Sequence, residues 1–158
     1  MKRIVSIILI VLTLILIYFL IPKIKLDSTE VTLNYNEKYS EGKVSARNVF
    51  KDYTKDVKVL GKVDTKKVGK YKINYVLNYG MLILKRTKTV NVVDKKEPVI
   101  TLEGNIDITL CPGCKYEEEG FSATDEYDGD LTDKVVKEQV KDEIVYTVED
   151  SAKNKVSV

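Results

Sequence analysis

The feature that most constrains the fold is a long, uncharged apolar segment near the N-terminus. Residues 4–21 contain only Ser6, Thr13 and Tyr18 as interruptions. A helix of this length is near the lower limit for crossing a bilayer core of roughly 30 Å. The segment predicts a membrane-spanning helix, so the membrane is an expected partner through residues 4–21. Any globular part must then be built from the residues that follow.

A cleaved signal peptide is the alternative explanation of this segment. It would have an apolar region of about 7–15 residues and small side chains at the cleavage site. Residues 17–27, IYFLIPKIKLD, offer bulky side chains instead, so an uncleaved signal anchor is favoured. With the basic tip of Lys2 and Arg3 in the cytoplasm, we expect a single-pass cell-membrane protein whose C-terminal part is extracellular.

Charge separates the rest of the chain into two halves. Residues 23–94 hold 16 Lys or Arg and 8 Asp or Glu, whereas residues 95–158 hold 8 and 16. The net charges of +8 and −8 indicate two units, joined at the charged sequence DKKEP, residues 94–98. A basic half beside the membrane suits anionic lipid or an anionic wall polymer, and a solvated lysine-rich surface is the alternative.

Strand-like alternation, rather than helical spacing, follows the anchor. Residues 71–93 predict a β-hairpin with its turn near the NYG sequence. One face of its first strand carries Tyr71, Ile73, Tyr75 and Leu77. The halves also resemble each other, because DVKVLGKV in the first matches DKVVKEQV in the second at an offset of 77 residues. Short strands and frequent turn signals in each half predict two small β-sandwiches, the second a shortened copy.

A spaced set of residues in the second half carries a family resemblance. It consists of EPVITLEG, then Tyr116, Gly120, Ala123 and Asp125, then DGDLT and finally YTVEDSAKN. This pattern resembles the bacterial immunoglobulin-like domain of the pesticidal crystal protein type, most clearly over residues 97–158. A fainter version lies in residues 28–94, in VGKYKINY and TVNVVD.

The resemblance implies an all-β fold class: an N-terminal transmembrane helix followed by two small tandem immunoglobulin-like β-sandwich units. The expected divisions are a cytoplasmic tip and signal anchor at 1–26, a first unit at 27–94 and a second, shortened unit at 95–158. Two positions depart from the family pattern. Glu119 replaces a proline, and Lys153 replaces a turn glycine, which predicts a rebuilt turn because a lysine at positive φ is strained.

The stretch SATDEYDGDLTDKV, residues 122–135, concentrates five acidic side chains. It fails as an EF-hand loop, because counting from Asp125 puts Tyr127 and Gly129 at positions that need side-chain oxygens. A looser calcium site is one interpretation, with the ligands Asp125, Asp128, Asp130 and Asp133. The favoured interpretation needs no cofactor: the aspartates accept backbone hydrogen bonds in successive turns.

The sequence CPGC places Cys111 and Cys114 at the ends of a four-residue turn. Pro-Gly in the middle fits a type II turn, which holds the end Cα atoms under about 7 Å apart, within the span of a disulfide. A disulfide in an oxidising exterior is the first choice. A free dithiol and a metal site are the alternatives, the latter weakened because the chain has no histidine and no second cysteine pair.

No catalytic site is expected. Without histidine there is no Ser-His or Cys-His pair. Glu117, Glu118, Glu119 and the aspartates could supply paired carboxylates for glycoside hydrolysis, but sandwiches this small rarely enclose a cleft in which a sugar can be distorted. A nucleic-acid partner is not expected either, because the lysine run at 62–72 lies in an extracellular strand segment. We expect a non-catalytic surface module for interaction or spacing, with cell-wall polymer or another surface protein as partner. The alternative is the N-terminal anchor and stalk of a larger secreted wall-modifying enzyme, in which coding sequence would continue past Val158.

Overall fold

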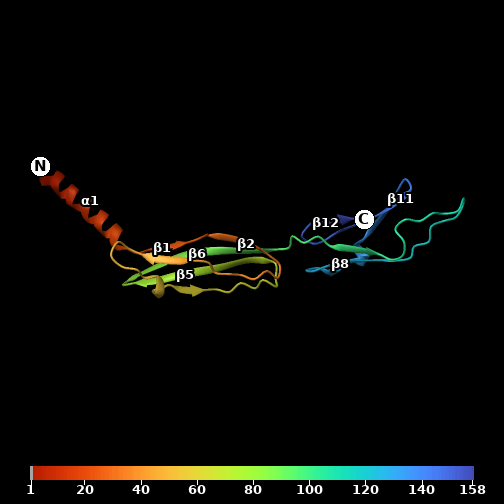
Figure 1. Cartoon of the computed structure of the whole chain (residues 1–158). Coiled ribbons are helices and arrows are strands. Elements are labelled where there is room, and N and C mark those ends of the chain that lie inside the picture. Colours follow the sequence, from red (N-terminus) through yellow and green to blue (C-terminus); the bar gives the residue numbers. More distant parts are fainter. Residues whose placement is uncertain (1) are drawn as a thin grey trace. The chain divides into compact units, whose positions relative to one another are not determined.

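The computed structural model describes residues 2–158 (Figure 1). It divides the chain into two compact units, Met1–Val93 and Asp94–Val158. Apart from one N-terminal helix and two short 3₁₀ turns, the regular structure is β-strand. The predicted all-β class with an N-terminal helix is therefore confirmed.

The apolar segment forms the helix α1 (Lys2–Leu20), none of whose residues is buried. By length and composition alone α1 could cross a membrane. It ends two residues before Pro22, as expected because proline disfavours helical geometry in the residue before it. The carbonyl oxygen of Leu20 accepts hydrogen bonds from the Asn48 side-chain amide at 2.6 Å and the Tyr79 hydroxyl at 3.2 Å. Side chains of the β-structure thus cap the end of the helix.

Unit 1 builds two sheets from six strands and one 3₁₀ turn. In chain order these are β1 (Lys23–Leu26), β2 (Glu30–Asn34), β3 (Val44–Arg47), η1 (Thr54–Asp56), β4 (Lys58–Leu60), β5 (Gly69–Tyr79) and β6 (Leu82–Val93). One sheet pairs β1 with β3, and the other has the order β2-β6-β5-β4, in which β2 runs parallel to β6.

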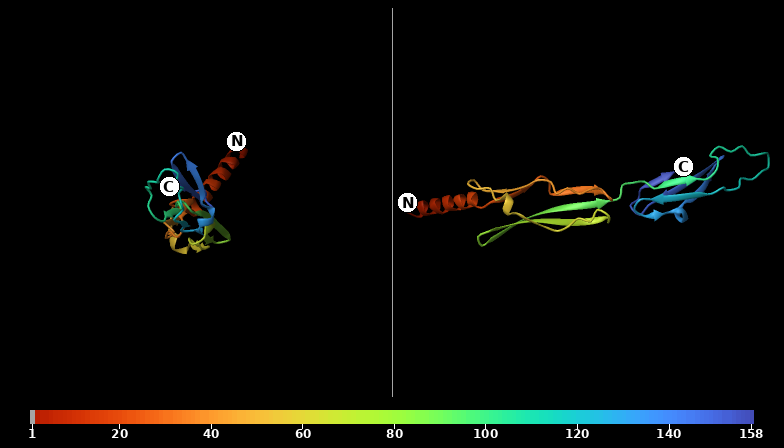
Figure 2. Two further views of the ribbon diagram at one scale, coloured as in Figure 1. Left: turned by 90° about the vertical axis from the view of Figure 1, so that its right-hand side faces the viewer. Right: turned by 60° about the horizontal axis from the view of Figure 1, so that its bottom comes forward.

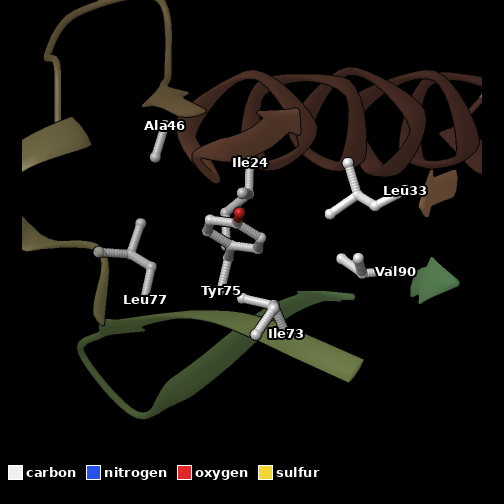
Figure 3. Close-up of a cluster of buried hydrophobic side chains, with 7 residues drawn as sticks. All are labelled: Ile24, Leu33, Ala46, Ile73, Tyr75, Leu77 and Val90. Atoms are coloured by element: carbon white, nitrogen blue, oxygen red, sulfur yellow. The ribbon is translucent and has the colours of Figure 1, made fainter. Parts of the chain in front are cut away.

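The core of unit 1 lies between these two sheets. Its buried side chains come from both of them, as Figure 3 shows: Ile24, Leu33, Ala46, Ile73, Tyr75, Leu77 and Val90. On β5 the buried residues alternate with more exposed ones, as period-two side-chain geometry requires. Because apolar side chains of both sheets share one core, unit 1 is a β-sandwich.

The predicted hairpin at 71–93 is confirmed by β5 and β6. Tyr79 pairs with Leu82, so Gly80 and Met81 form the two-residue turn. Gly80 has a φ of 58°, the value that the first central residue of a type II′ hairpin turn adopts and that glycine tolerates best. The long antiparallel pair of β5 and β6 forms the centre of the larger sheet.

Lys88 is a charged residue on the inner face of β6. It pairs in register with Ile73 and is only 1% exposed. Its Nζ donates hydrogen bonds to Asp27 Oδ1 and to the Glu41 carbonyl oxygen, both at 2.8 Å. The Lys88 hydrogen bond, followed by those from the backbone N–H groups of Lys43 and Ser28, lowers the pKa of Asp27 to about 2. The buried ammonium is therefore compensated by a carboxylate far away in the sequence.

Unit 2 has the same kind of architecture. Its elements are β7 (Val99–Leu102), β8 (Phe121–Asp125), β9 (Gly129–Asp130), η2 (Thr132–Lys134), β10 (Val136–Val140), β11 (Glu143–Glu149) and β12 (Lys155–Ser157). They form the sheets β7-β8-β9 and β10-β11-β12. The buried core residues between them are Ile100, Ala123, Leu131, Tyr146 and Val148. The segment 103–120 forms a long excursion between β7 and β8, drawn in teal in Figure 2.

The two units share one local hydrogen-bonding arrangement. In unit 1 the backbone N–H of Ala46 donates to Thr54 Oγ1 at 3.0 Å, and its carbonyl oxygen accepts from the N–H of Tyr53. In unit 2 the N–H of Ala123 donates to Thr132 Oγ1 at 3.0 Å, and its carbonyl accepts from Leu131. Both alanines are fully buried, so each threonine satisfies a backbone donor that water cannot reach.

The expectation of a rebuilt turn at Lys153 is wrong. Lys153 adopts a φ of 75°, so it occupies the left-handed conformation itself. The turn is closed by the Asp150 N–H, which donates to the Asn154 carbonyl at 3.0 Å, and by the Asn154 N–H, which donates to Asp150 Oδ1 at 2.8 Å. These bonds outweigh the strain of a non-glycine residue at this position.

Candidate functional site

Four aspartates of unit 2 converge on one place. Asp125 ends β8, Asp128 lies in the turn to β9, Asp150 follows β11 and Asp94 begins the unit. One carboxylate oxygen of each lies within 4.8 Å of those of the other three. Asp94, Asp125 and Asp150 are 8%, 9% and 4% exposed, and Asp128 is half-buried. Three of the four carboxylates are thus largely removed from water.

Backbone hydrogen bonds fix two of these side chains in their turns. Asp125 Oδ1 accepts from the N–H groups of Tyr127 at 2.7 Å and Asp128 at 2.9 Å. Asp128 Oδ2 accepts from the N–H of Ser151 at 2.8 Å, which connects the β8–β9 turn to the turn after β11. The turn role that the sequence predicted for the aspartates is confirmed at Asp125, whereas Asp128 accepts from a backbone N–H 23 residues away.

Asn154 and the start of unit 2 hold the other two carboxylates. Asp150 Oδ2 accepts from the Asn154 side-chain amide at 2.6 Å, and the same amide donates to the Asp94 carbonyl oxygen at 3.5 Å. Asp94 Oδ1 accepts from the N–H of Lys96 at 3.1 Å. All four aspartates are therefore positioned by hydrogen bonds within unit 2.

Two oxygens of the cluster lack partners. Oδ2 of Asp94 and Oδ2 of Asp125 are buried and accept no hydrogen bond. An unpartnered buried carboxylate oxygen is costly, because it loses hydration without replacement. Mutual repulsion adds to the cost: two unit charges 4.8 Å apart repel by about 3.5 kcal/mol at an effective dielectric constant of about 20.

The pKa shifts follow from these environments. Burial raises the pKa of Asp94; the N–H of Lys96 opposes this, and the carboxylates of Asp125, Asp150 and Asp128 reinforce it. The pKa of Asp128 is lowered, chiefly by the hydrogen bond from the Ser151 backbone. One cluster thus contains carboxyl groups whose pKa values are pushed in opposite directions.

The structure brings together only part of the calcium set considered from the sequence. Asp125 and Asp128 belong to the cluster. Asp130 instead accepts from the N–H and hydroxyl of Thr132, at 2.9 and 2.7 Å, and these bonds lower its pKa. Asp133 is exposed and lies outside the cluster.

Sequence reasoning missed the two remaining members, Asp94 and Asp150. Asp94 lies in the DKKEP linker and Asp150 in the YTVEDSAKN pattern. The sequence signal that could have identified them is their place beside a strand, because Asp94 directly follows β6 and Asp150 directly follows β11. Only the closure of the sandwich shows that these boundaries meet.

The structure joins Cys111 and Cys114 by a disulfide, with their Cα atoms 5.3 Å apart. Gly113 has a φ of 82°, and the Cys114 N–H donates to the Cys111 carbonyl oxygen at 3.0 Å, as in a type II turn. Both cysteines are exposed on the segment 103–120. The bridge therefore fastens a surface turn and is not part of the carboxylate cluster.

Glu118 anchors the same segment to the sandwich. It accepts hydrogen bonds from the Tyr146 hydroxyl at 2.6 Å and from the Lys137 ammonium. The Lys137 and Tyr146 bonds, in that order, lower the pKa of Glu118 to about 2. A groove of about 580 Å³ lies beside this contact, lined by the segment, β11 and Val158. With its charge held by two partners, Glu118 is suited to fastening the segment and not to acting as a general acid at neutral pH.

A known domain family matches the first unit. Residues 24–92 match the family described as "Bacterial surface protein, Ig-like domain". The immunoglobulin-like part of the sequence resemblance is thereby confirmed for unit 1, where the sequence pattern was fainter. The match does not extend to residues 97–158, and the pesticidal crystal protein type stays a prediction. A search of curated proteins gave no match.

Two solved structures resemble parts of the chain. The crystal structure of a lipoprotein from Bacteroides thetaiotaomicron has a TM-score of 0.45 and 14% identity, and the alignment covers 87% of this chain and 77% of that one. The structure of CBM51-2 in complex with GlcNAc and INT domains, from Clostridium perfringens ZmpB, has a TM-score of 0.38 and 18% identity. That alignment covers 52% of this chain and 20% of the other.

Proposed function

We propose that the chain is a membrane-anchored surface protein whose two immunoglobulin-like units lie outside the membrane and serve interaction or spacing without catalysis. The observation that carries this proposal is the order of elements. A helix of membrane-spanning length, uncharged after Lys2 and Arg3, ends at Leu20, and a match to a bacterial surface domain family begins at residue 24. A helix that could cross a membrane, followed at once by a match to a surface domain, supports an anchored surface module.

The partner we propose is cell-wall polymer or another surface protein. Unit 1 supports an anionic partner, because the lysines of the 62–72 run are solvent-exposed on a unit with a large positive charge. Clustered exposed lysines raise the local concentration of anionic polymers, and salt weakens this attraction. We expect the double charge reversal Lys66→Glu/Lys67→Glu to weaken sedimentation of the detergent-solubilised chain with purified wall polymer. The matched control Lys95→Glu/Lys115→Glu, in unit 2, should sediment as the wild type does.

The anchor and the orientation can be tested together in intact cells. The chain should fractionate with membranes, and after mild reduction a membrane-impermeant maleimide should label Cys111 and Cys114 from outside. Leu12→Arg places a charge in the middle of α1, which costs about 2.5–3.5 kcal/mol for insertion; this variant should lose both membrane retention and outside labelling, whereas Leu12→Val should keep both.

A wild-type chain that is soluble, or that is labelled only after lysis, would contradict the proposal. An immunoblot of the same membranes measures the size of the protein and so distinguishes the surface module from the alternative function. A band near 18.0 kDa supports the surface module. A much larger band would instead support the anchor and stalk of a larger enzyme.

A further inference from the structure

We infer that unit 2 contains a calcium site formed by the carboxylates of Asp94, Asp125, Asp128 and Asp150. The first observation is their geometry. Oxygens bound to one calcium ion at 2.3–2.6 Å can lie at most about 4.6–5.2 Å apart. The four carboxylates offer oxygens that all lie within 4.8 Å of one another, a spacing that matches oxygens sharing one calcium ion.

The second observation is independent of the clustering. Asp94 and Asp125 are each more than nine-tenths buried, and each has a buried Oδ2 that accepts no hydrogen bond. Their Oδ1 atoms are already used by backbone N–H groups. A folded protein rarely leaves such oxygens without a partner, and a cation is the partner that two neighbouring carboxylates share.

Among the residues that the structure describes, no side-chain cation fills this role. Within residues 2–158, no lysine or arginine forms an ion pair with any of the four aspartates. Lys96 is close in sequence to Asp94, but its ammonium contacts Glu126 at 2.8 Å. A metal ion would neutralise the cluster where the protein does not.

The chemistry of the donors favours calcium over other metals. All are hard carboxylate oxygens, which calcium and magnesium prefer, and the chain has no histidine. Calcium accepts the irregular geometry that four side chains from three separate segments provide, whereas magnesium demands a near-ideal octahedron at 2.0–2.1 Å. The ion would connect the start of unit 2 with the β8–β9 turn and the turn after β11. Affinities of extracellular calcium modules suggest a Kd of about 0.1–1 mM.

The test is calcium titration of the full chain in detergent micelles by isothermal titration calorimetry, combined with thermal unfolding in 10 mM calcium, 10 mM magnesium or chelator. We expect one calcium ion per chain and a rise of about 5 °C or more in the Tm of unit 2. Asp94→Asn and Asp125→Asn should abolish both effects. In chelator these variants should melt no lower than the wild type, since Asn keeps the Oδ1 contacts and removes repulsion. Asp133→Asn, on the same acidic stretch but outside the cluster, should bind as the wild type does.

Two results would overturn the inference: no calcium binding by the wild-type chain up to 10 mM, or binding that persists unchanged in Asp94→Asn and Asp125→Asn. A measurement on the wild type alone guards against variants that fail to fold. Amide hydrogen exchange should slow on calcium addition at residues 125–128 and 150–154, and unchanged exchange there also refutes the site. Neither result depends on whether α1 anchors the chain.

Discussion

Thr132 offers the sharpest test of how unit 2 is held together. Its Oγ1 is the acceptor for the backbone N–H of Ala123, which is fully buried on β8, and it also donates to Asp130 at 2.7 Å. Thr132→Val keeps the branched shape and removes the hydroxyl. The Ala123 donor then has no partner, which costs about 1–3 kcal/mol. For a unit of this size each 1 kcal/mol corresponds to about 4–8 °C, so the Tm of unit 2 should fall by at least about 4 °C.

The assay is differential scanning calorimetry of the full chain, with amide hydrogen exchange to assign each transition to its unit. Thr132→Ser retains Oγ1 and should lose much less stability than Thr132→Val. Thr54→Val should lower the Tm of unit 1 by a similar amount, because Thr54 makes the equivalent bond to Ala46. If Thr132→Val melted like Thr132→Ser, the hydroxyl would not be the acceptor that matters, and the reasoning from the shared arrangement would fail.

Two further predictions concern backbone strain and pH. Lys153→Gly should stabilise unit 2 by about 1 kcal/mol, because glycine adopts the φ of 75° without the steric cost that lysine bears; denaturant titration measures this, and equal stabilisation by Lys153→Ala would refute it. The pKa of Asp27 is lowered from 3.8 to about 2 by Lys88 and backbone N–H groups. This group therefore contributes stability that is present above about pH 4 and is lost as the pH falls towards 2. Acid titration of Asp27→Asn should show a flatter loss of unit 1 stability over this range, and a profile identical to the wild type would contradict the linkage.

Local patterns predicted much of the secondary structure. The uncharged run at residues 4–21 correctly predicted the helix α1. The alternation along Tyr71–Leu77 correctly predicted that Ile73, Tyr75 and Leu77 lie on the buried face of β5. These features depend on residues a few positions apart, where helix and strand geometry dictate which side chains share a face. The CPGC turn was readable for the same reason, because its geometry lies within four residues.

Long-range contacts could not be predicted in this way. A lysine in the strand sequence KRTKTV is expected to point to water, yet Lys88 is buried because Asp27 and Glu41 reach it from distant parts of the chain. The parallel pairing of β2 with β6 is likewise invisible to any periodicity. The sequence predicts strain at Lys153, but it does not show that Lys153 adopts the left-handed conformation, because this depends on the hydrogen bonds between Asp150 and Asn154 that close the turn.

The acidic sequence at 122–135 shows which properties the sequence determines and which ones depend on the tertiary structure. By itself the sequence determined that aspartates would cluster in turns of a β-sandwich, since carboxylates accept backbone N–H groups wherever such turns form. The tertiary structure decided which of them face one another: it kept Asp125 and Asp128, turned Asp130 towards Thr132, and added Asp94 and Asp150. Asp94 and Asp150 are 56 residues apart in the chain. Asp94 lies ahead of β7 and Asp150 follows β11, so the two meet only when the two sheets of unit 2 pack on their shared core and Asn154 bonds to both residues.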